Sequence, residues 1–362
     1  MKFAIACGGT GGHLFPGLAV AEVLRAQGHE VLLFVSEKEV DARALRAYPD
    51  LPSAKLPSIG LPAVFSPAMV TFLRRLRESL KKCGAAYDAD RPHAVLGMGG
   101  FTSIAPLIAA RRRGIPAFLH ESNAIPGKAN RLAARFCRAV LLGFDDCARH
   151  FPKRRTQVTG TPIRRELAAD APGKTEVRRA LGLDPETTTL LVMGGSQGAA
   201  GINAIMMQAA PHLSSARLQI VHLSGERDAD TVRSVYAAAG IKAVVLPFCD
   251  RMQDVYPAAD LAVSRSGAAS LGELSWFGLP SVLVPFPYAA EDHQRLNAEI
   301  FVRSGAARLQ AEKGATGESV ARLLLSLLES PQTLATMSAS AKALAPRDAA
   351  ARVAAVLTEA QA

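Results

Sequence analysis

Three glycine-rich turns in the sequence have the composition of loops that bind anionic or hydroxyl-rich ligands. They lie at residues 8–13, 97–103 and 194–198, and each follows an apolar run with strand character. Glycine permits a tight turn and a close approach of the main chain to a ligand, and the helix that follows offers free N–H groups and the positive end of its dipole. Packing alone explains one such turn equally well, whereas three in one chain favour a ligand site.

A fourth segment combines serine, glycine and a carboxylate in the pattern SRSGAASLGE at residues 264–273, followed by GLP at residues 278–280. Its serines and Gly267 begin a predicted helix whose first amide groups can hold a diphosphate, and Glu273 lies about one and a half turns further on. A carboxylate there can accept two hydrogen bonds from vicinal ribose hydroxyls. An acid in the first turn that complements the helix dipole is the alternative, and the residues alone leave both open.

Two side chains are candidates for accepting a proton. His13 ends the first glycine-rich turn, and an unperturbed imidazole, with a pKa of about 6.5, accepts a proton near neutral pH. Glu121 is the second candidate for this role. A helix-capping or buried structural histidine is the alternative interpretation of His13.

Several other site chemistries are not expected. The dinucleotide pattern GxGxxG with its downstream acid and the P-loop pattern GxxxxGK[ST] are both missing in proper form. The five cysteines form no CxxC pair, so neither a zinc site nor a disulfide framework is predicted. Two Asp-x-Asp pairs, at residues 88–90 and 228–230, are the type of motif that binds a divalent metal. Because they fall at a helix-to-strand turn and at a predicted helix start, we interpret both as structural and expect no metal or cofactor.

The elements that must position these residues alternate between short apolar strands and longer helices, a rhythm that is typical of parallel sheets with helical crossovers. The rhythm occurs twice, with a Gly-Thr-Pro turn at residues 160–162 between the two copies. We therefore predict an α/β fold with one domain at residues 1–161, a second at 162–340, and a terminal helix at 341–362 that returns to the first. The predicted strands are 3–7, 30–35, 94–98, 117–120, 139–142 and 157–158, then 189–193, 219–223, 243–246, 261–263 and 281–284.

Charge is distributed unevenly along the 362 residues, whose net charge is +10. Residues 1–163 contain 23 Lys and Arg against 12 Asp and Glu, whereas residues 164–362 contain 19 against 20. A basic half indicates a polyanionic partner surface, either nucleic acid or acidic lipid. No apolar run approaches the ~18 residues that a membrane-spanning helix needs, so a peripheral, cytoplasmic protein is expected.

One predicted helix suits a membrane surface. Met69, Phe72, Leu73, Leu76 and Leu80 recur at helical spacing and predict an apolar stripe. A core-facing helix with a solvated cationic side is the alternative, and the pattern alone slightly favours it, whereas a lipid-linked acceptor would favour the membrane surface. The predicted membrane contacts are Phe72, Leu73, Arg74, Arg75, Leu76, Leu80, Lys81 and Lys82.

The motifs together resemble one family. GGTGGHLFPGLAVA, GMGGF, HESN, GGSQGA, SRSGA with GE and GLP, and DHQRLNA occur in this order across essentially the whole chain. This set is similar to the MurG family, the undecaprenyl-diphospho-muramoylpentapeptide N-acetylglucosaminyltransferases. The resemblance implies the GT-B fold, two Rossmann-like domains facing a cleft, at the cytoplasmic face of the inner membrane. It also implies inverting transfer of N-acetylglucosamine (GlcNAc) from UDP-GlcNAc to the C4 hydroxyl of the muramoyl sugar of lipid I, giving lipid II for peptidoglycan.

The resemblance also implies roles for individual positions, with His13 or Glu121 as the base. Departures from the usual pattern at residues 101–103 and 293–296 concern the acceptor side and the donor-sugar contacts. Cys249 falls where the family places a main-chain contact to uracil. The donor-binding positions implied are Thr10, Gly11, Gly12, Asn123, Arg164, Ser196, Cys249, Ala268, Ala269, Ser270, Leu271, Gly272, Glu273, Gln294 and Asn297.

Other functions stay open at this point. A related GT-B enzyme with a different lipid acceptor, or a UDP-sugar epimerase, shares most of these features. A nucleic-acid-binding module is the non-enzymatic alternative, but the sequence lacks an aromatic RNA-binding strand, a zinc finger and a basic dimer helix. No nucleic-acid partner is therefore expected.

Overall fold

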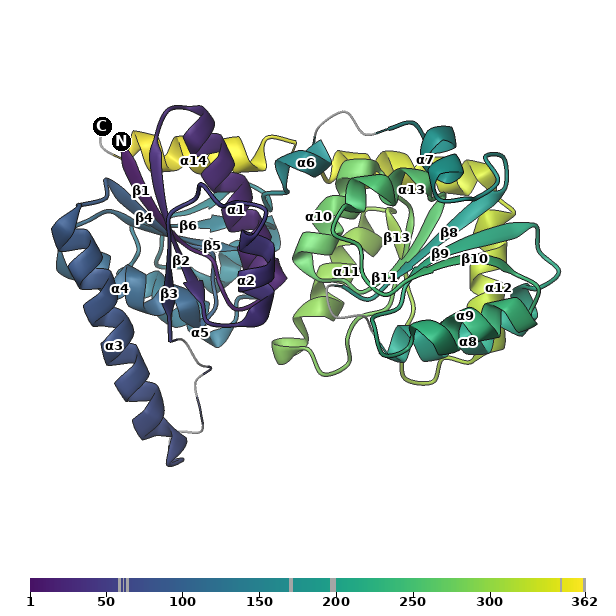
Figure 1. The fold of residues 1–362 in the computed structure, drawn as a ribbon, viewed down its shortest axis with the longest axis horizontal. Coiled ribbons are helices and arrows are strands. Elements are labelled where there is room, and N and C mark those ends of the chain that lie inside the picture. The colour runs from purple at the N-terminus through teal and green to yellow at the C-terminus, as the bar shows by residue number, and fades with distance from the viewer. Residues whose placement is uncertain are drawn as a thin grey trace. The chain divides into compact units, whose positions relative to one another are not determined.

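The computed structural model describes residues 1–57, 60, 62, 65–168, 172–195, 200–345 and 347–360. The chain divides into two compact units, Met1–Arg165 with Asp348–Ala362, and Glu166–Arg347 (Figure 1). The boundaries predicted from sequence lie slightly earlier, after residues 161 and 340.

The first unit is built on a seven-stranded sheet with the order β3-β2-β1-β4-β5-β6-β7. Every neighbouring pair is parallel. The strand β3 was missed from sequence because Ser-Ala-Lys-Leu is short, largely exposed and not β-branched. The strands are β1 Lys2–Ala6, β2 Glu30–Ser36, β3 Ser53–Leu56, β4 Ala94–Gly97, β5 Ala117–Glu121, β6 Ala139–Leu142 and β7 Thr156–Val158.

The helices of the first unit cover this sheet. The C-terminal helix α14 (Ala349–Glu359) packs on α1 (Gly11–Ala26), and its Val353 and Leu357 join Phe3 and Leu18 in one buried cluster. The expected single helix at 341–362 is instead divided between this helix and the end of the second unit. The remaining helices are α2 Glu39–Leu45, α3 Ala68–Ala89, η1 Phe101–Ser103, α4 Ile104–Arg112, α5 Lys128–Ala133, η2 Ala134–Phe136 and η3 Asp145–His150, with the short α6 Arg165–Ala168 where the units meet in sequence.

The second unit has a six-stranded parallel sheet with the order β10-β9-β8-β11-β12-β13. The three-residue edge strand β13 was also missed from sequence, since two of its residues are exposed. The strands are β8 Thr188–Met193, β9 Leu218–Leu223, β10 Lys242–Leu246, β11 Leu261–Ser264, β12 Ser281–Leu283 and β13 Ala307–Leu309. The helices are α7 Lys174–Ala180, α8 Ala200–Leu213, α9 Ala229–Ala238, η4 Met252–Asp254, η5 Tyr256–Ala258, α10 Ala268–Phe277, η6 Ala290–Asp292, α11 His293–Arg303, α12 Gly317–Leu328 and α13 Pro331–Ala343.

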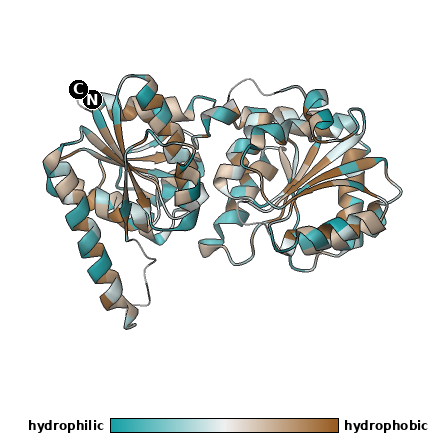
Figure 2. Cartoon of the chain, viewed as in Figure 1, coloured by the Kyte–Doolittle hydropathy of each residue, from teal (hydrophilic) through white to brown (hydrophobic). Residues whose placement is uncertain are grey.

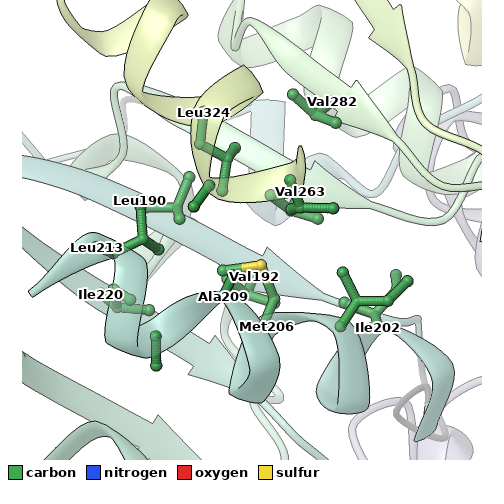
Figure 3. Close-up of a cluster of buried hydrophobic side chains, with 14 of the residues drawn as sticks. Leu190, Val192, Ile202, Met206, Ala209, Leu213, Ile220, Val263, Val282 and Leu324 are labelled. Atoms are coloured by element: carbon green, nitrogen blue, oxygen red, sulfur yellow. The ribbon is translucent and has the colours of Figure 1, made fainter. Parts of the chain in front are cut away.

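The central strands of both sheets are apolar along their length, as parallel strands covered on two faces must be (Figure 2). In the second unit, Val192 and Val263 on the sheet meet Met206 of α8 and Leu324 of α12 in one buried cluster (Figure 3). The predicted α/β class with two Rossmann-like units is therefore confirmed. In the described part of the chain, no helix is long and apolar enough to cross a bilayer.

Candidate active site

The first glycine-rich turn joins β1 to α1 and holds Thr10 and His13. A Cβ atom on Gly8 would lie 2.3 Å from the Ser36 amide nitrogen, and Gly9 has φ +100°, so both positions require glycine. Thr10 is extended and precedes the helix, and its Oγ1 lies 3.1 Å from His13 Nδ1. The first turn of α1 consists of Gly11, Gly12 and His13. The amide groups of this turn lie at the N-terminal end of the helix.

The second glycine-rich turn follows β4, the neighbour of β1, and lies against the His13 ring. A Cβ atom built on Gly99 would be 3.1 Å from His13 Nε2, and one on Gly100 would be 3.1 Å from His13 Cε1. Both glycines have positive φ, +105° and +69°. The structure thus brings two of the predicted glycine-rich turns together around His13.

Glu121 ends β5 and is the centre of a buried hydrogen-bond network. Its Oε1 accepts from the backbone and side-chain nitrogens of Asn123 at 2.9 and 3.0 Å, and its Oε2 accepts from Asn130 Nδ2 at 2.7 Å. Asn130 Oδ1 in turn accepts from the Gly100 amide at 3.0 Å. Burial raises the pKa of Glu121, and these hydrogen bonds oppose that shift. The carboxyl group, only 2% exposed, therefore ties Asn123 to the second glycine-rich turn.

Two more polar groups of the first unit have defined surroundings. Arg164 is buried after β7, with its guanidinium carbon 4.4 Å from the ring centroid of Phe15 on α1. His120 Nε2 lies 2.9 Å from the Gly160 carbonyl, and burial, with a smaller effect of His13, lowers the His120 pKa to about 4. His120 is thus neutral near pH 7 and structural.

The predicted diphosphate segment of the second unit has the expected local structure. Gly267 is extended after β11, and α10 begins at Ala268, so the amides of Ala268, Ala269 and Ser270 open the helix. Leu271 is buried beneath this turn, and Gly272 is half-buried.

Glu273 is the sixth residue of α10 and therefore lies beyond the first turn. This position removes the alternative of a first-turn acid that serves the helix dipole. Its Oε2 accepts from the Tyr256 hydroxyl at 2.7 Å, and Tyr256 is stacked on Phe277 with ring centroids 4.9 Å apart. Tyr256 was not identified from sequence, because its partner lies 17 positions away in another element.

Gln294 and Asn297 of α11 are bonded to the segment that precedes α10. Ser266 Oγ donates to the Gln294 carbonyl at 2.8 Å, and Asn297 Nδ2 donates to the Ser266 carbonyl at 3.1 Å. Gln294 Oε1 accepts from the Phe286 amide at 2.9 Å. The loop before α11 carries Glu291 and Asp292 at φ +55° and +53°, a conformation that non-glycine residues rarely adopt.

A buried arginine that sequence reasoning missed supports the same loop. Arg265 Nη1 donates to the carbonyls of Val284 and Pro285 at 3.0 and 3.1 Å and pairs with Glu312 at 2.5 Å. Arg265 is part of the SRSGA pattern, but the pattern does not indicate that its side chain is buried. Of the other predicted donor positions, Cys249 is half-buried in the segment after β10, and Ser196 lies outside the described residues.

The helix α3 corrects the predicted membrane contacts. Leu76 and Leu80 pack against the core of the first unit, and Phe72 meets Phe101 edge to face at 6.1 Å between ring centroids. These three side chains were expected on an exposed stripe, and Arg75 is half-buried beside them. This stripe of α3 faces the core of the first unit, because α4 packs beside the helix.

A different apolar group at this end of the unit is exposed. Leu73 is 55% exposed, Val70 is 72% exposed, and Phe65 before the helix is fully exposed. Arg74, Arg77, Lys81 and Lys82 are also exposed. Leu73, Arg74, Lys81 and Lys82 are thus as exposed as predicted, whereas Phe65 and Val70 were missed.

The four carboxylates of the Asp-x-Asp pairs are all engaged with basic or amide side chains. Asp88 pairs with Arg113 at 2.6 Å, and Asp90 pairs with Lys2. Asp228 accepts from Asn203 at 2.8 Å, and Asp230 pairs with Arg233 at 2.5 Å. Among the described residues, no three His, Cys, Asp or Glu side chains gather as metal ligands.

Comparison with known proteins agrees with this geometry. The glycosyltransferase family 28 N-terminal domain matches residues 3–142, and the family 28 C-terminal domain matches residues 189–353. The UDP-N-acetylglucosamine–N-acetylmuramyl-(pentapeptide) pyrophosphoryl-undecaprenol N-acetylglucosamine transferase of Citrifermentans bemidjiense is 40% identical, over 97% of this chain and 97% of its own length.

Solved structures are similar over the whole chain. The crystal structure of Acinetobacter baumannii MurG is 26% identical with a TM-score of 0.79 and covers 99% of both chains. A Listeria monocytogenes structure described as a UDP-N-acetylglucosamine 2-epimerase has a TM-score of 0.71 over 99% of this chain and 96% of its own, at 14% identity, which shows a shared fold alone. The chain is a glycosyltransferase of GT-B fold, and it belongs to glycosyltransferase family 28 and, within it, to the UDP-N-acetylglucosamine–N-acetylmuramyl-(pentapeptide) pyrophosphoryl-undecaprenol N-acetylglucosamine transferases.

Proposed function

We propose that the protein transfers GlcNAc from UDP-GlcNAc to the C4 hydroxyl of the muramoyl sugar of an undecaprenyl-diphosphate-linked acceptor, lipid I. The product is lipid II, a precursor of peptidoglycan. The observation that carries the donor assignment is Glu273, oriented by Tyr256 one turn behind the open amides of α10. The 40% identical relative from Citrifermentans bemidjiense is named for both of these substrates.

The donor site follows from the second unit. The first amides of α10 carry the positive end of the helix dipole and bind the diphosphate. Glu273 accepts hydrogen bonds from the ribose hydroxyls, and the main chain at Cys249 meets uracil. Gln294 and Asn297 place the segment that reads the sugar, since both are bonded to Ser266 and its neighbours. For Thr10, Gly11, Gly12 and Asn123 of the first unit, the donor contacts that the family resemblance implies remain predictions.

The chemical step needs a base and a stabilised leaving group. His13 takes the proton of the C4 hydroxyl while that oxygen attacks C1 of GlcNAc and the bond from C1 to the UDP oxygen breaks, with inversion at C1. The proposal assigns the proton to His13 Nδ1, which lies 3.1 Å from Thr10 Oγ1, so that Nε2 carries the lone pair. The α10 amides, Arg164 and Ser196 stabilise the charge that develops on UDP.

Glu121 is a positioning residue in this proposal. Its oxygens accept from Asn123 and Asn130, and Asn130 holds the Gly100 amide against which the His13 ring lies. A carboxyl group with these partners stabilises the loop instead of taking the substrate proton.

Peripheral association with the cytoplasmic face of the inner membrane completes the proposal. The lipid-linked acceptor keeps its sugar close to the headgroups, so the enzyme must approach that surface. The exposed Phe65, Val70 and Leu73 with the surrounding cations of α3 fit an anionic bilayer.

The test is a transfer assay with UDP-GlcNAc radiolabelled in the sugar and a lipid I analogue. A labelled disaccharide that depends on the acceptor is the expected product. Conversion of the labelled UDP-GlcNAc to UDP-N-acetylmannosamine without acceptor would identify an epimerase and overturn the proposal, as would transfer to an unrelated lipid acceptor in preference to the muramoyl one.

A further inference from the structure

A buried carboxylate outside the proposed site contacts the first glycine-rich turn. Asp41, on the short helix α2, is fully buried. Its Oδ2 accepts from the Gly9 amide at 2.8 Å, from the Ser36 amide at 2.8 Å and from Ser36 Oγ at 2.5 Å. Its Oδ1 is buried without a hydrogen-bond partner among the described residues. A carboxylate in this condition is costly to bury, and its retention needs a reason.

The first glycine-rich turn packs closely against Asp41. A Cβ atom on Gly8 would lie 2.3 Å from the Ser36 amide nitrogen and 2.7 Å from Asp41 Oδ2, so glycine at this position leaves room for the end of β2 and for the carboxylate. Lys38, at the N-cap of α2, donates from Nζ to the Gly9 carbonyl at 2.9 Å. Asp41 and Lys38, both at α2, therefore hold the N–H and the C=O of the same residue.

Gly9 leads directly into the residues that the transfer reaction uses. Thr10 follows it, and the Thr10 carbonyl accepts from the His13 amide at 3.1 Å and from the Leu14 amide at 3.0 Å. Thr10 Oγ1 also contacts His13 Nδ1. Fixing the Gly9 peptide therefore fixes the start of α1 and with it the position of the His13 ring.

A purely structural role for Asp41 accounts for only part of its contacts. The two bonds to Ser36 close the end of β2, and an acid in the first turn of α2 complements the helix dipole. Neither role requires the bond to the Gly9 amide. This bond concerns the turn that carries Thr10 and His13.

We propose that Asp41 is a positioning residue for glycosyl transfer, which acts through the Gly9 peptide to set Thr10 and His13. It contacts no substrate. The inference rests on the proposed role of His13 as the base.

The test compares Asp41→Asn with Ser36→Ala in the full-length enzyme. Asp41→Asn keeps the size and weakens a charged hydrogen bond to Gly9, so kcat should fall by about 10-fold or more while UDP affinity changes little. Ser36→Ala removes a donor to the same oxygen but leaves the Gly9 bond, and its kcat should stay within about twofold. Equal losses in the two variants, or an Asp41→Asn kcat near wild type, would overturn the proposal.

A double variant separates positioning from general destabilisation. If Asp41 acts through His13, then Asp41→Asn should cause little further loss of kcat in a His13→Ala background. A loss as large as that in the wild-type background would show that Asp41 acts independently of His13.

Two spectroscopic readouts hold whether or not transfer is the activity. In Asp41→Asn, the Gly9 amide should exchange faster with solvent and the His13 ring resonances should shift, and neither should change in Ser36→Ala. Unchanged Gly9 exchange would overturn the positioning role even if transfer is confirmed. If Asp41→Asn does not fold, Lys38→Ala can take its place, because the Lys38 side chain is exposed and its removal breaks the hydrogen bond to the Gly9 carbonyl. The same Gly9 and His13 signals should then change.

Discussion

At the residue scale, the orientation of Glu273 depends on the buried Tyr256 and on the half-buried Phe277 ring that is stacked against it. The Tyr256 hydroxyl donates to Oε2, and the Tyr256 ring is stacked on Phe277, so the carboxylate is presented from α10 in a defined direction. Glu273→Ala should raise the KM for UDP-GlcNAc by about 10-fold or more, because a hydrogen bond to a charged group contributes about 1.5–3 kcal/mol. Steady-state kinetics with Tyr256→Phe as a milder companion variant measures this. An unchanged KM in folded Glu273→Ala would contradict the ribose assignment.

His13 should control the rate of the chemical step. Its ring lies against the main chain of Gly99 and Gly100, which leaves its position little freedom. His13→Ala should lower kcat by about 10²–10⁴, as expected for a lost general base, with little effect on UDP binding. Single-turnover rates and UDP titration distinguish the two effects. A surviving kcat with lost UDP affinity would mean that His13 binds the donor.

The sequence indicated Glu273 and His13 because each belongs to a local motif. Asn130, Arg265 and Asp41 were missed because their partners are distant in sequence, for example the Gly100 amide, which lies 30 positions before Asn130. A local pattern contains the glycine that a turn needs, but it does not contain the side chain that holds the turn.

At the element scale, α3 shows how an amphipathic pattern can be assigned to the wrong partner. The spacing of Phe72, Leu76 and Leu80 was interpreted as a membrane stripe, yet it serves the core and the second glycine-rich turn. Helical periodicity identifies the buried face and not what buries it. On α3 itself, the large apolar side chains that are exposed are Val70 and Leu73, and Phe65 is exposed before the helix.

Membrane binding should therefore depend on the exposed side chains of α3. Charge reversal of Arg74, Lys81 and Lys82 to Glu should release the protein from phosphatidylglycerol vesicles, since each cation near the surface contributes about 1 kcal/mol. Activity on a water-soluble acceptor should persist. Phe65→Ser with Leu73→Ser should weaken binding even at high salt, and the matched change Leu80→Ser should instead lower thermal stability. Equal sedimentation of wild type and the charge-reversed protein with vesicles at low salt would place the membrane surface elsewhere.

The contact of β9 with α8 and α9 should make the second unit sensitive to acid. His222 Nδ1 lies 2.9 Å from the Tyr236 hydroxyl and Nε2 lies 3.0 Å from Asn203 Oδ1, and burial lowers the His222 pKa to about 3. The unfolded chain binds a proton below about pH 6.5 and the folded chain does not, so stability is full above that pH and is lost as pH falls toward 3.

Within this pH range, the proton that His222 binds only in the unfolded chain should lower the free energy of unfolding by about 1.4 kcal/mol for each unit by which the pH falls. Denaturant unfolding of wild type and His222→Gln between pH 7 and pH 5 measures the slope, and the variant should be less pH-dependent although less stable at pH 7. An identical slope in both proteins would show that His222 does not titrate on unfolding.

At the scale of the whole molecule, the alternation of strands and helices predicted both parallel sheets and the α/β class. The strands that were missed, β3 and β13, are short edge strands with exposed residues, where burial supplies little hydrophobic pattern. The sequence motifs that make up the candidate site could be identified within each unit. Its supporting contacts could not, because they form only when strands distant in sequence become neighbours.

The molecule as a whole should transfer sugar without a divalent ion. In a metal-dependent glycosyltransferase an Asp-x-Asp pair binds the divalent ion that neutralises the diphosphate, whereas here those carboxylates pair with Arg113, Lys2 and Arg233 or accept from Asn203. We propose that the open amides of α10 supply positive charge for the same purpose. Turnover in excess EDTA should equal turnover in buffer, and Asp88→Asn and Asp230→Asn should retain full activity. If EDTA abolishes turnover, Mg²⁺ or Mn²⁺ restores it, and either Asp variant also loses activity, then a metal at that Asp-x-Asp pair binds the diphosphate. That result would contradict the role proposed for α10.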